Sequence, residues 1–274
     1  MDITSVRKIV SGIRTHLFKR SNSYSVGVLK SHFRGTGLQF KEHQVYGFGD
    51  DVRFIDWKLY AKTANPYIKT FTEERNVEIV VVLDTRVNML SGYKGVSKLK
   101  AAIEICCLFY LLAKESNDYV STIIVADDIY NMEKKSGEEG ITVLINKLRK
   151  LKIIDELGNI NLNRNFSDSE QDASVFKKLM DQVRRKRELV VLSDFNTFLS
   201  KEMLKRLATH SNTHLIRIIS PIDELSKLPY TFSAKAGLVK QASNNEIKKV
   251  LEGIKHISLN VKDRYLENFV KEMI

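Results

Sequence analysis

Residues 77–84 read Val77-Glu78-Ile79-Val80-Val81-Val82-Leu83-Asp84, and this run indicates the fold class. A continuous, mostly β-branched apolar run is expected for a strand that is covered on both faces, as the strands of parallel sheets are. Asp84 follows at once, so we predict a carboxylate at the carboxyl end of a central strand. In open α/β sheets, ligands bind at that edge.

From residue 84 to the carboxyl end, helix-like segments alternate with short buried strands. This alternation predicts an α/β domain over residues 77–274, with a mostly parallel sheet and helices on both faces. Residues 221–243 are expected to be irregular, with one strand or hairpin. The expected strands are Tyr119–Ala126, Glu188–Leu192 and His214–Ile219, with a short edge strand at Tyr130–Lys135, and the expected helices are Lys98–Lys114, Ile141–Leu151, Ser174–Arg187, Lys201–Thr209, Glu246–Ile254 and Lys262–Met273.

The segment before this domain, residues 1–76, has a different pattern. Ile3–Leu17 has apolar residues at helical spacing with basic residues between them, which predicts a short amphipathic helix. We expect it to pack on its own domain, with a membrane or partner surface as the alternative. Glycines and aromatics then mix with strand-like pieces at Val52–Ile55 and Tyr67–Phe71, so we predict a β-rich extension.

Composition narrows the class of protein without choosing a function. The net charge of +11 permits contact with nucleic acid, acidic partners or anionic membranes. No basic helix with interleaved aromatics occurs, so we expect no nucleic-acid partner. The adjacent Cys106 and Cys107 offer no disulfide framework, which fits the reducing cytoplasm. The longest apolar run, Ile105–Ala113, is far below the roughly 20 residues of a membrane span.

Acidic residues follow the predicted strands, and their arrangement resembles the Rossmann-like von Willebrand A fold. The metal-adhesion motif of that fold reads Asp-x-Ser-x-Ser after the first strand, with a further Asp after a later strand. Asp84 matches the first position and Asp194 the later one, whereas Arg86 and Asn88 replace the two serines. The resemblance therefore implies a metal site of Asp84, Asn88 and Asp194 that has lost part of its ligand set.

The two replacements change what this site can bind. Mg²⁺ takes about six oxygen ligands, and Asn88 can still supply one, but the guanidinium of Arg86 offers only donors. A unit positive charge about 4 Å from a divalent ion costs about 8 kcal/mol at an effective dielectric near 20. We therefore expect no cofactor or weakly bound Mg²⁺, with Arg86 paired to Asp84 or Asp194. The alternative is that both acids only cap loops.

The stretch from Arg34 to Lys58 carries the pattern RGxGxxFxExxxYxxGDDVRxIDWKxxA, completed by Ala61. It resembles the DUF58 family, whose members have a von Willebrand A-like domain and are often encoded beside MoxR-type AAA+ ATPases. The resemblance implies a non-catalytic adaptor or chaperone-like partner of such an ATPase, acting with client proteins in the assembly or maturation of complexes. It implies no small-molecule substrate.

Within this stretch, charged residues interleave with apolar ones from Gly49 to Lys58. One interpretation is a fixed ion-pair hinge beside buried aromatics, which would hold the front segment to the core. The other is a surface that the ATPase recognises. The residues assigned to this binding surface are Asp50, Asp51, Arg53, Asp56 and Trp57.

A different class of function is a metal-dependent nuclease. Asp56-Trp57-Lys58 fits the Asp-x-Lys half of such a site, with Asp50 or Asp51 as the upstream carboxylate. Two-metal hydrolysis needs carboxylates that converge on an open site. The separation here is short for the usual arrangement on two strands, so this hypothesis is the alternative.

Overall fold

The computed structural model describes residues 38–47, 50–73, 77–162, 172–185, 187–224, 233–234, 237–238 and 250–273. Residues 34–76 form one compact unit, and the described part of the chain from Val77 onward belongs to a second. The predicted helix Ile3–Leu17 lies outside the described residues.

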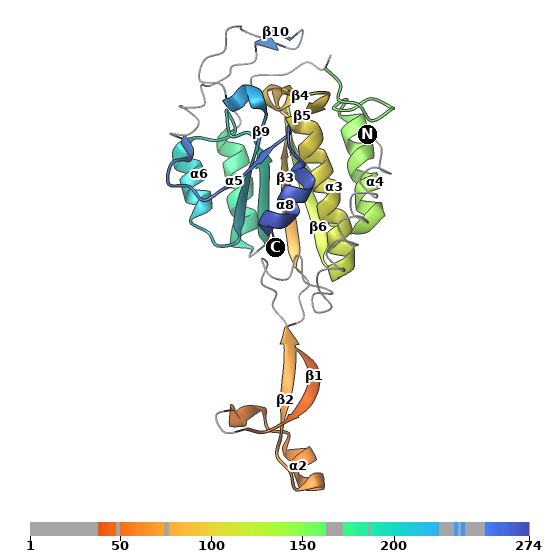
Figure 1. Ribbon diagram of the computed structural model, residues 1–274, viewed down its shortest axis with the longest axis vertical. Coiled ribbons are helices and arrows are strands. Elements are labelled where there is room, and N and C mark those ends of the chain that lie inside the picture. The colour runs from red at the N-terminus through yellow and green to blue at the C-terminus, as the bar shows by residue number, and fades with distance from the viewer. Residues whose placement is uncertain are drawn as a thin grey trace. The chain divides into compact units, whose positions relative to one another are not determined.

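A six-stranded sheet forms the centre of the larger unit (Figure 1). Its order is β12-β9-β8-β3-β6-β7, and all pairs are parallel except β6–β7. This confirms the predicted mostly parallel sheet. The strands are β3 (Glu78–Asp84), β6 (Tyr119–Val125), β7 (Ile129–Asn131), β8 (Glu188–Ser193), β9 (Thr213–Ile219) and β12 (Ile257–Asn260).

Helices cover both faces of this sheet, as predicted, and two apolar clusters fill the space between the layers. One cluster packs α3, α4 and α8 against the sheet, and the other packs α5 and α6 against the opposite face. The helices are α3 (Lys98–Ser116), α4 (Gly137–Lys150), α5 (Asp172–Arg184), α6 (Lys201–Ala208) and α8 (Tyr265–Met273). Among the described residues, no helix combines the length and apolar character that crossing a bilayer requires.

Helix α3 is buried along most of its length and has defined ends. Ser97 caps its first turn by accepting a hydrogen bond from the Lys100 amide, and Asn117 ends it in the left-handed conformation. Cys106 is fully buried on this helix, and burial raises the pKa of its thiol to about 12. This fits an inert core thiol.

Short elements lead from β3 to the start of α3: the 3-10 turn η2 (Val87–Leu90) and the hairpin of β4 (Gly92–Tyr93) and β5 (Val96–Ser97). The hairpin turns through Lys94 (φ 45°) and Gly95 (φ 81°), the left-handed pair that tight hairpin turns favour. Because β5 ends at the cap of α3, this hairpin determines where Lys98 enters the core.

The smaller unit is a two-stranded antiparallel ribbon with two short helical segments (Figure 1). Its elements are β1 (Leu38–Val45), the 3-10 turn η1 (Val52–Phe54), α2 (Trp57–Thr63) and β2 (Tyr67–Glu73). The strand expected at Val52–Ile55 was therefore wrong. Asp51 and Asp56 each accept backbone hydrogen bonds at the start of a helical turn, and this capping outweighs the β-branched residues between them.

Two further differences concern the carboxyl-terminal part. Strand β12, whose four residues pair with β9 at the sheet edge, was not predicted. Helix α4 begins four residues earlier than predicted, because Gly137 and Gly140 resemble a turn in the sequence. The irregular region contains the 3-10 turn η3 (Pro221–Glu224) and a two-residue hairpin of β10 (Ser233–Ala234) and β11 (Gly237–Leu238).

Candidate functional site

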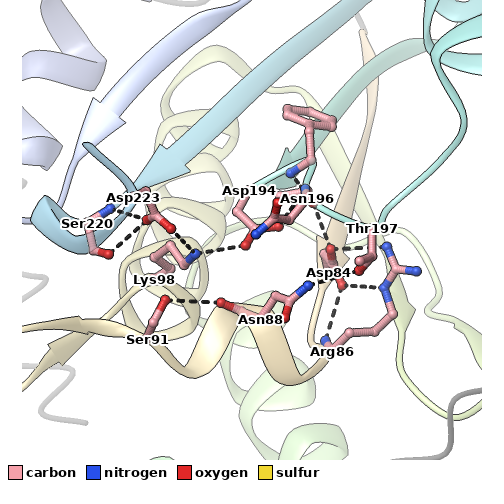
Figure 2. Close-up of polar contacts among 12 residues, drawn as sticks. Asp84, Arg86, Asn88, Ser91, Lys98, Asp194, Asn196, Thr197, Ser220 and Asp223 are labelled. Atoms are coloured by element: carbon pink, nitrogen blue, oxygen red, sulfur yellow. Dashed lines mark hydrogen bonds and ion pairs between the residues drawn. The ribbon is translucent and has the colours of Figure 1, made fainter. Parts of the chain in front are cut away.

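The carboxyl ends of β3 and β8 lie side by side at one edge of the sheet. Leu83 pairs with Leu192, so Asp84 and Ser193 end neighbouring strands, and Asp194 follows at once. The Ser193 hydroxyl donates to Asp84 Oδ2 at 2.7 Å. The structure thus brings the two predicted carboxylates, Asp84 and Asp194, to one site (Figure 2).

Arg86 turns back onto Asp84. Its backbone N–H and its Nε each donate to Asp84 Oδ1 at 3.1 Å, and its Nη2 lies 3.4 Å from Oδ2. The guanidinium also lies 3.7 Å from Asp172 and over the Phe198 ring. Burial works against the charge, but the contacts with Asp84 and the charges of Asp172 and Asp194 together raise the pKa of Arg86. Of the two partners expected from sequence, the direct contact is with Asp84.

Lys98, the first residue of α3, is a site residue that the sequence analysis did not predict. Its side chain is 1% exposed, and Nζ lies 2.7 Å from Asp194 Oδ2 and 3.2 Å from Asp223 Oδ1. A buried lysine needs carboxylate partners, but a lysine at the start of a helix is usually exposed, so the local sequence did not mark this residue. The sequence did not show which carboxylates these are.

Asp223 lies in η3, just beyond β9, and it too was missed. Its Oδ2 accepts hydrogen bonds from the Ser220 backbone N–H at 2.7 Å and from the Ser220 hydroxyl at 2.8 Å. Burial disfavours its charge, but the Lys98 ammonium and the Ser220 hydrogen bonds lower its pKa below the ordinary value. Asp223 is therefore an ionised partner of Lys98.

Arg217 brings a third cation to this edge from β9. It is 6% exposed, and its register partner is Ser193, the residue before Asp194. Burial lowers its pKa, and the charges of Asp223 and Asp194 oppose that shift. Two buried cations and the half-buried Arg86 thus face three buried carboxylates. We call this group the charge network: Arg86, Lys98, Arg217, Asp84, Asp194 and Asp223.

Two amides lie among these charges. Asn88, a predicted ligand, donates from Nδ2 to Thr197 Oγ1 at 3.1 Å, whereas its buried Oδ1 has no hydrogen-bond partner in the described part of the chain. Asn196 Oδ1 also has no hydrogen-bond partner among the described residues, whereas the backbone N–H of Asn196 donates to Asp194 Oδ1 at 3.0 Å. Figure 2 shows both amides between Asp84 and Lys98.

The residues present do not fit a bound divalent cation. Mg²⁺ needs about six oxygens at about 2.0–2.1 Å, several of them water. Both oxygens of Asp84 accept from Arg86 or Ser193, and those of Asp194 accept from Lys98 and Asn196. The charge network is already balanced. Across the described ranges, no group of three or more His, Cys, Asp or Glu side chains is placed to hold a metal.

In the smaller unit, two of the charged residues singled out from sequence, Asp51 and Arg53, form an ion pair that is local to η1. Arg53 Nη2 lies 2.6 Å from Asp51 Oδ2, and the hydrogen bonds from Arg53 lower the pKa of Asp51 to about 2. The neighbouring aromatics are exposed: Trp57 by 65% and Phe54 by 42%. The expectation of buried aromatics beside this pair was therefore wrong.

The carboxylates of the nuclease alternative hold local turns. Asp56 Oδ1 accepts from the N–H groups of Lys58 and Leu59, and its Oδ2 lies 3.0 Å from His43 Nε2 and 3.4 Å from Lys69 Nζ. Asp50 Oδ2 accepts from the Gly47 N–H at 2.8 Å. These contacts favour a structural role for both carboxylates over metal ligation.

Comparison with protein families gives one match that spans most of the chain: the family described as "Protein of unknown function DUF58" matches residues 42–257. Among curated proteins, uncharacterized proteins Mb1516 of Mycobacterium bovis and MT1527 of Mycobacterium tuberculosis are each 26% identical over 90 residues. Those matches cover 33% of this chain, which spans 28% of the length of either relative.

Among solved structures, the chain is similar to the conserved hypothetical protein BatB from Bacteroides thetaiotaomicron, with a TM-score of 0.43 and 14% identity over 72% of this chain and 97% of that one. It is also similar to the SpRpn10 VWA domain, with a TM-score of 0.35 and 12% identity over 72% of this chain and 94% of that domain.

Proposed function

We propose that this chain, which belongs to the DUF58 family, is a non-catalytic interaction protein that acts in the cytoplasm. Its proposed partner is a MoxR-type AAA+ ATPase, and its proposed task is that of an adaptor when client protein complexes are assembled or matured. The relationship between this family and such ATPases supports the choice of partner.

The observation that carries this proposal is the exposure of large apolar side chains in the smaller unit. Nine large apolar residues are exposed among the described residues, and five of them lie within positions 45–60. We call these five the 45–60 surface: Val45, Val52, Phe54, Trp57 and Tyr60. Concentrated apolar exposure marks protein-interaction sites, and Trp and Tyr are enriched among the residues that contribute most to binding.

Local structure holds two members of this surface in place. Trp57 begins α2, where the Asp56 side chain caps the first turn, and Tyr60 follows one turn later. Their rings meet edge to face with centroids 6.1 Å apart. An ordered aromatic pair loses little conformational freedom when it binds a partner, which favours a docking role.

The charge network supports the non-catalytic part of the proposal. Its carboxylates accept hydrogen bonds from internal cations and hydroxyls, so they are engaged in holding the sheet edge together. Catalytic carboxylates need a geometry in which they reach a substrate or an activated water.

Co-purification with the MoxR-type ATPase, with ATP and with a non-hydrolysable analogue, tests the proposal. We expect the full chain to recover the ATPase and Trp57→Ala to recover at least tenfold less. Tyr119→Ala is the matched control, because Tyr119 is an aromatic residue of the larger unit that is 41% exposed. Failure of the wild-type chain to recover the ATPase with either nucleotide would contradict the partner.

A further inference from the structure

We infer that a recess beside the hairpin of β4 and β5 docks a partner protein through a segment in which an apolar side chain lies next to carboxylates. We call it the hairpin recess: it has a volume of about 390 Å³ and is lined by residues of segments 90–97 and 158–162, together with Lys100 of α3. It shares no residue with the charge network or with the 45–60 surface. The inference does not depend on which ATPase the chain binds.

The two walls of the hairpin recess are held in place by local structure. In the hairpin, Tyr93 pairs with Val96, and the backbones approach so closely at Gly92 that a Cβ there would lie 2.1 Å from the Val96 carbonyl oxygen. In the opposite wall, the Asn159 N–H donates to Asp155 Oδ1 at 2.7 Å, and the Asp155 N–H donates to the Asn159 carbonyl oxygen at 2.9 Å. A preformed recess of this kind loses little conformational freedom when it binds a partner.

Apolar side chains from both walls line the hairpin recess: Leu90, Tyr93, Val96, Ile160 and Leu162. Leu162 is 58% exposed, and Leu157, five positions earlier in the same loop, is 80% exposed. Exposed apolar side chains that gather at a recess mark an interaction site. The hairpin recess can therefore take an apolar side chain of a partner.

The charge of the hairpin recess is positive. Among the described residues that line it, Lys94 and Lys100 are charged and none is a carboxylate. Lys94 Nζ lies 5.4 Å from the centroid of the Tyr93 ring, a cation–π contact that keeps the ammonium group beside the recess. Glu104 acts on Lys100 through space, but burial raises the pKa of this carboxyl group, which makes it a weaker counter-charge. Carboxylates of a partner can therefore pair with both lysines.

A larger recess of about 520 Å³ elsewhere in this unit lacks that combination. Four cations line it, and three of them already pair with Glu78 or Glu139 at 2.6–2.7 Å: Lys134, Lys135 and Arg187. It therefore offers less positive charge to an acidic partner than the hairpin recess does.

Charge and shape together specify the occupant. An apolar side chain fits between the apolar walls, and carboxylates beside it complement the two lysines, an arrangement that favours encounter and orients the bound segment. A protein segment offers both groups within a few residues. Because the recess is concave, a projecting side chain can enter it, whereas the surface of a bilayer cannot follow its walls.

Fluorescence polarisation with the full chain tests the inference. The probe is a rhodamine-labelled peptide with blocked ends and the sequence Ser-Asp-Glu-Leu-Phe-Asp-Glu-Ser. The wild-type chain should bind it. Affinity should fall at least tenfold when serines replace the Leu and Phe of the probe, and also when Asn and Gln replace its Asp and Glu. These comparisons use the wild-type chain alone, so they do not depend on the folding of any variant.

Substitutions in the chain locate the binding site. Lys94→Glu and Leu162→Ala, at exposed positions, should each weaken binding of the original probe at least fivefold. Lys205→Glu is the control for charge, because the exposed Lys205 lies on α6, which packs on the opposite face of the sheet. Leu157→Ala is the control for apolar surface, because Leu157 is more exposed than Leu162 but does not line the recess. Both controls should bind as the wild type does.

Four results would overturn the inference. The first is a wild-type chain that leaves the polarisation of the probe unchanged. The second is an equal loss of binding in Lys94→Glu and Lys205→Glu, which would show attraction by net charge alone. The third is a wild-type dimer that Leu162→Ala dissociates, which would assign the recess to a second copy of the chain. The fourth is binding to phosphatidylglycerol vesicles without binding to the peptide. Since no ATPase enters these measurements, their result is separate from that of the co-purification.

Discussion

The ammonium group of Lys98 lies 3.2 Å from the carboxylate of Asp223, a residue 125 positions further along the chain. This contact joins the start of α3 to the turn after β9, two places that meet only because β3, β8 and β9 are neighbours in the sheet. The pair is buried on both sides, and Ser220 holds the carboxylate in its orientation.

Asp223→Ala should destabilise the larger unit by about 3 kcal/mol, since removing one partner of a buried ion pair is strongly destabilising and leaves Lys98 with Asp194 in place of two carboxylates. Glu224→Ala is the control, because the hydrogen bond that Glu224 accepts from Asn260 in the described part of the chain is exposed. It should change the free energy of unfolding by less than about 1 kcal/mol. Denaturant unfolding followed by circular dichroism measures both. If both variants lower the free energy of unfolding equally, the Lys98–Asp223 ion pair is not a major source of stability.

The double variant Arg86→Ser with Asn88→Ser should bind Mg²⁺ more tightly than the wild type. It removes the guanidinium that occupies Asp84 Oδ1 and supplies two hydroxyl oxygens in its place. Isothermal calorimetry in full-length protein is the measurement, with little or no heat expected from the wild type. Micromolar binding by the wild type would show that Arg86 does not exclude the ion.

The smaller unit should lose stability as the pH falls from about 4 toward 2. The Leu59 N–H and His43 lower the pKa of Asp56 from its ordinary 3.8 to about 2. A carboxyl group whose pKa is lower in the folded state than in the unfolded state stabilises the fold at pH values above its unfolded-state pKa. This stabilisation is lost as the pH falls through the folded-state pKa and the group is protonated. Trp57 is the sole tryptophan, so its fluorescence reports this unit.

Asp56→Asn is the matched variant for that titration, because Asn also caps helices but does not titrate. Its Trp57 fluorescence should change less with pH over the same acidic range than that of the wild type. If the variant and the wild type give superimposable acid titrations, another group controls the transition.

Glu104→Gln should make the stability of the larger unit less dependent on pH above the ordinary carboxyl pKa of 4.5. Burial raises the pKa of Glu104, and the Tyr265 hydroxyl donates to its carboxylate. A raised carboxyl pKa favours the protonated form in the folded state, so the wild type loses stability as the pH rises through that pKa. Glutamine keeps an acceptor for Tyr265 without the charge.

Denaturant unfolding at several pH values checks this, with Glu267→Gln, at an exposed position of α8, as the control. The control should follow the wild-type pH profile. A Glu104→Gln profile as steep as that of the wild type would show that ionisation of Glu104 does not contribute to it.

The local pattern of apolar residues predicted most helices and strands. It failed where helix capping or strand pairing determined the structure instead. The β-branched residues of Val52–Ile55 indicated a strand, but Asp51 and Asp56 cap successive helical turns there. The four residues of β12 carry too short an alternation to be distinguished from a loop, and pairing with β9 makes them a strand. In both cases the competing interaction is stronger than the propensity of the segment.

The order of apolar runs along the chain was enough to establish a mostly parallel sheet with helices on both faces and with Asp84 and Asp194 at one edge. This follows because buried strands and amphipathic helices have different periods, and parallel strands present their carboxyl ends together. The pairing of Lys98 with Asp194 and Asp223, and the approach of Arg217, came only from the folded chain. Strand order and the entry point of α3 set these contacts, and both depend on packing between segments that are distant in sequence.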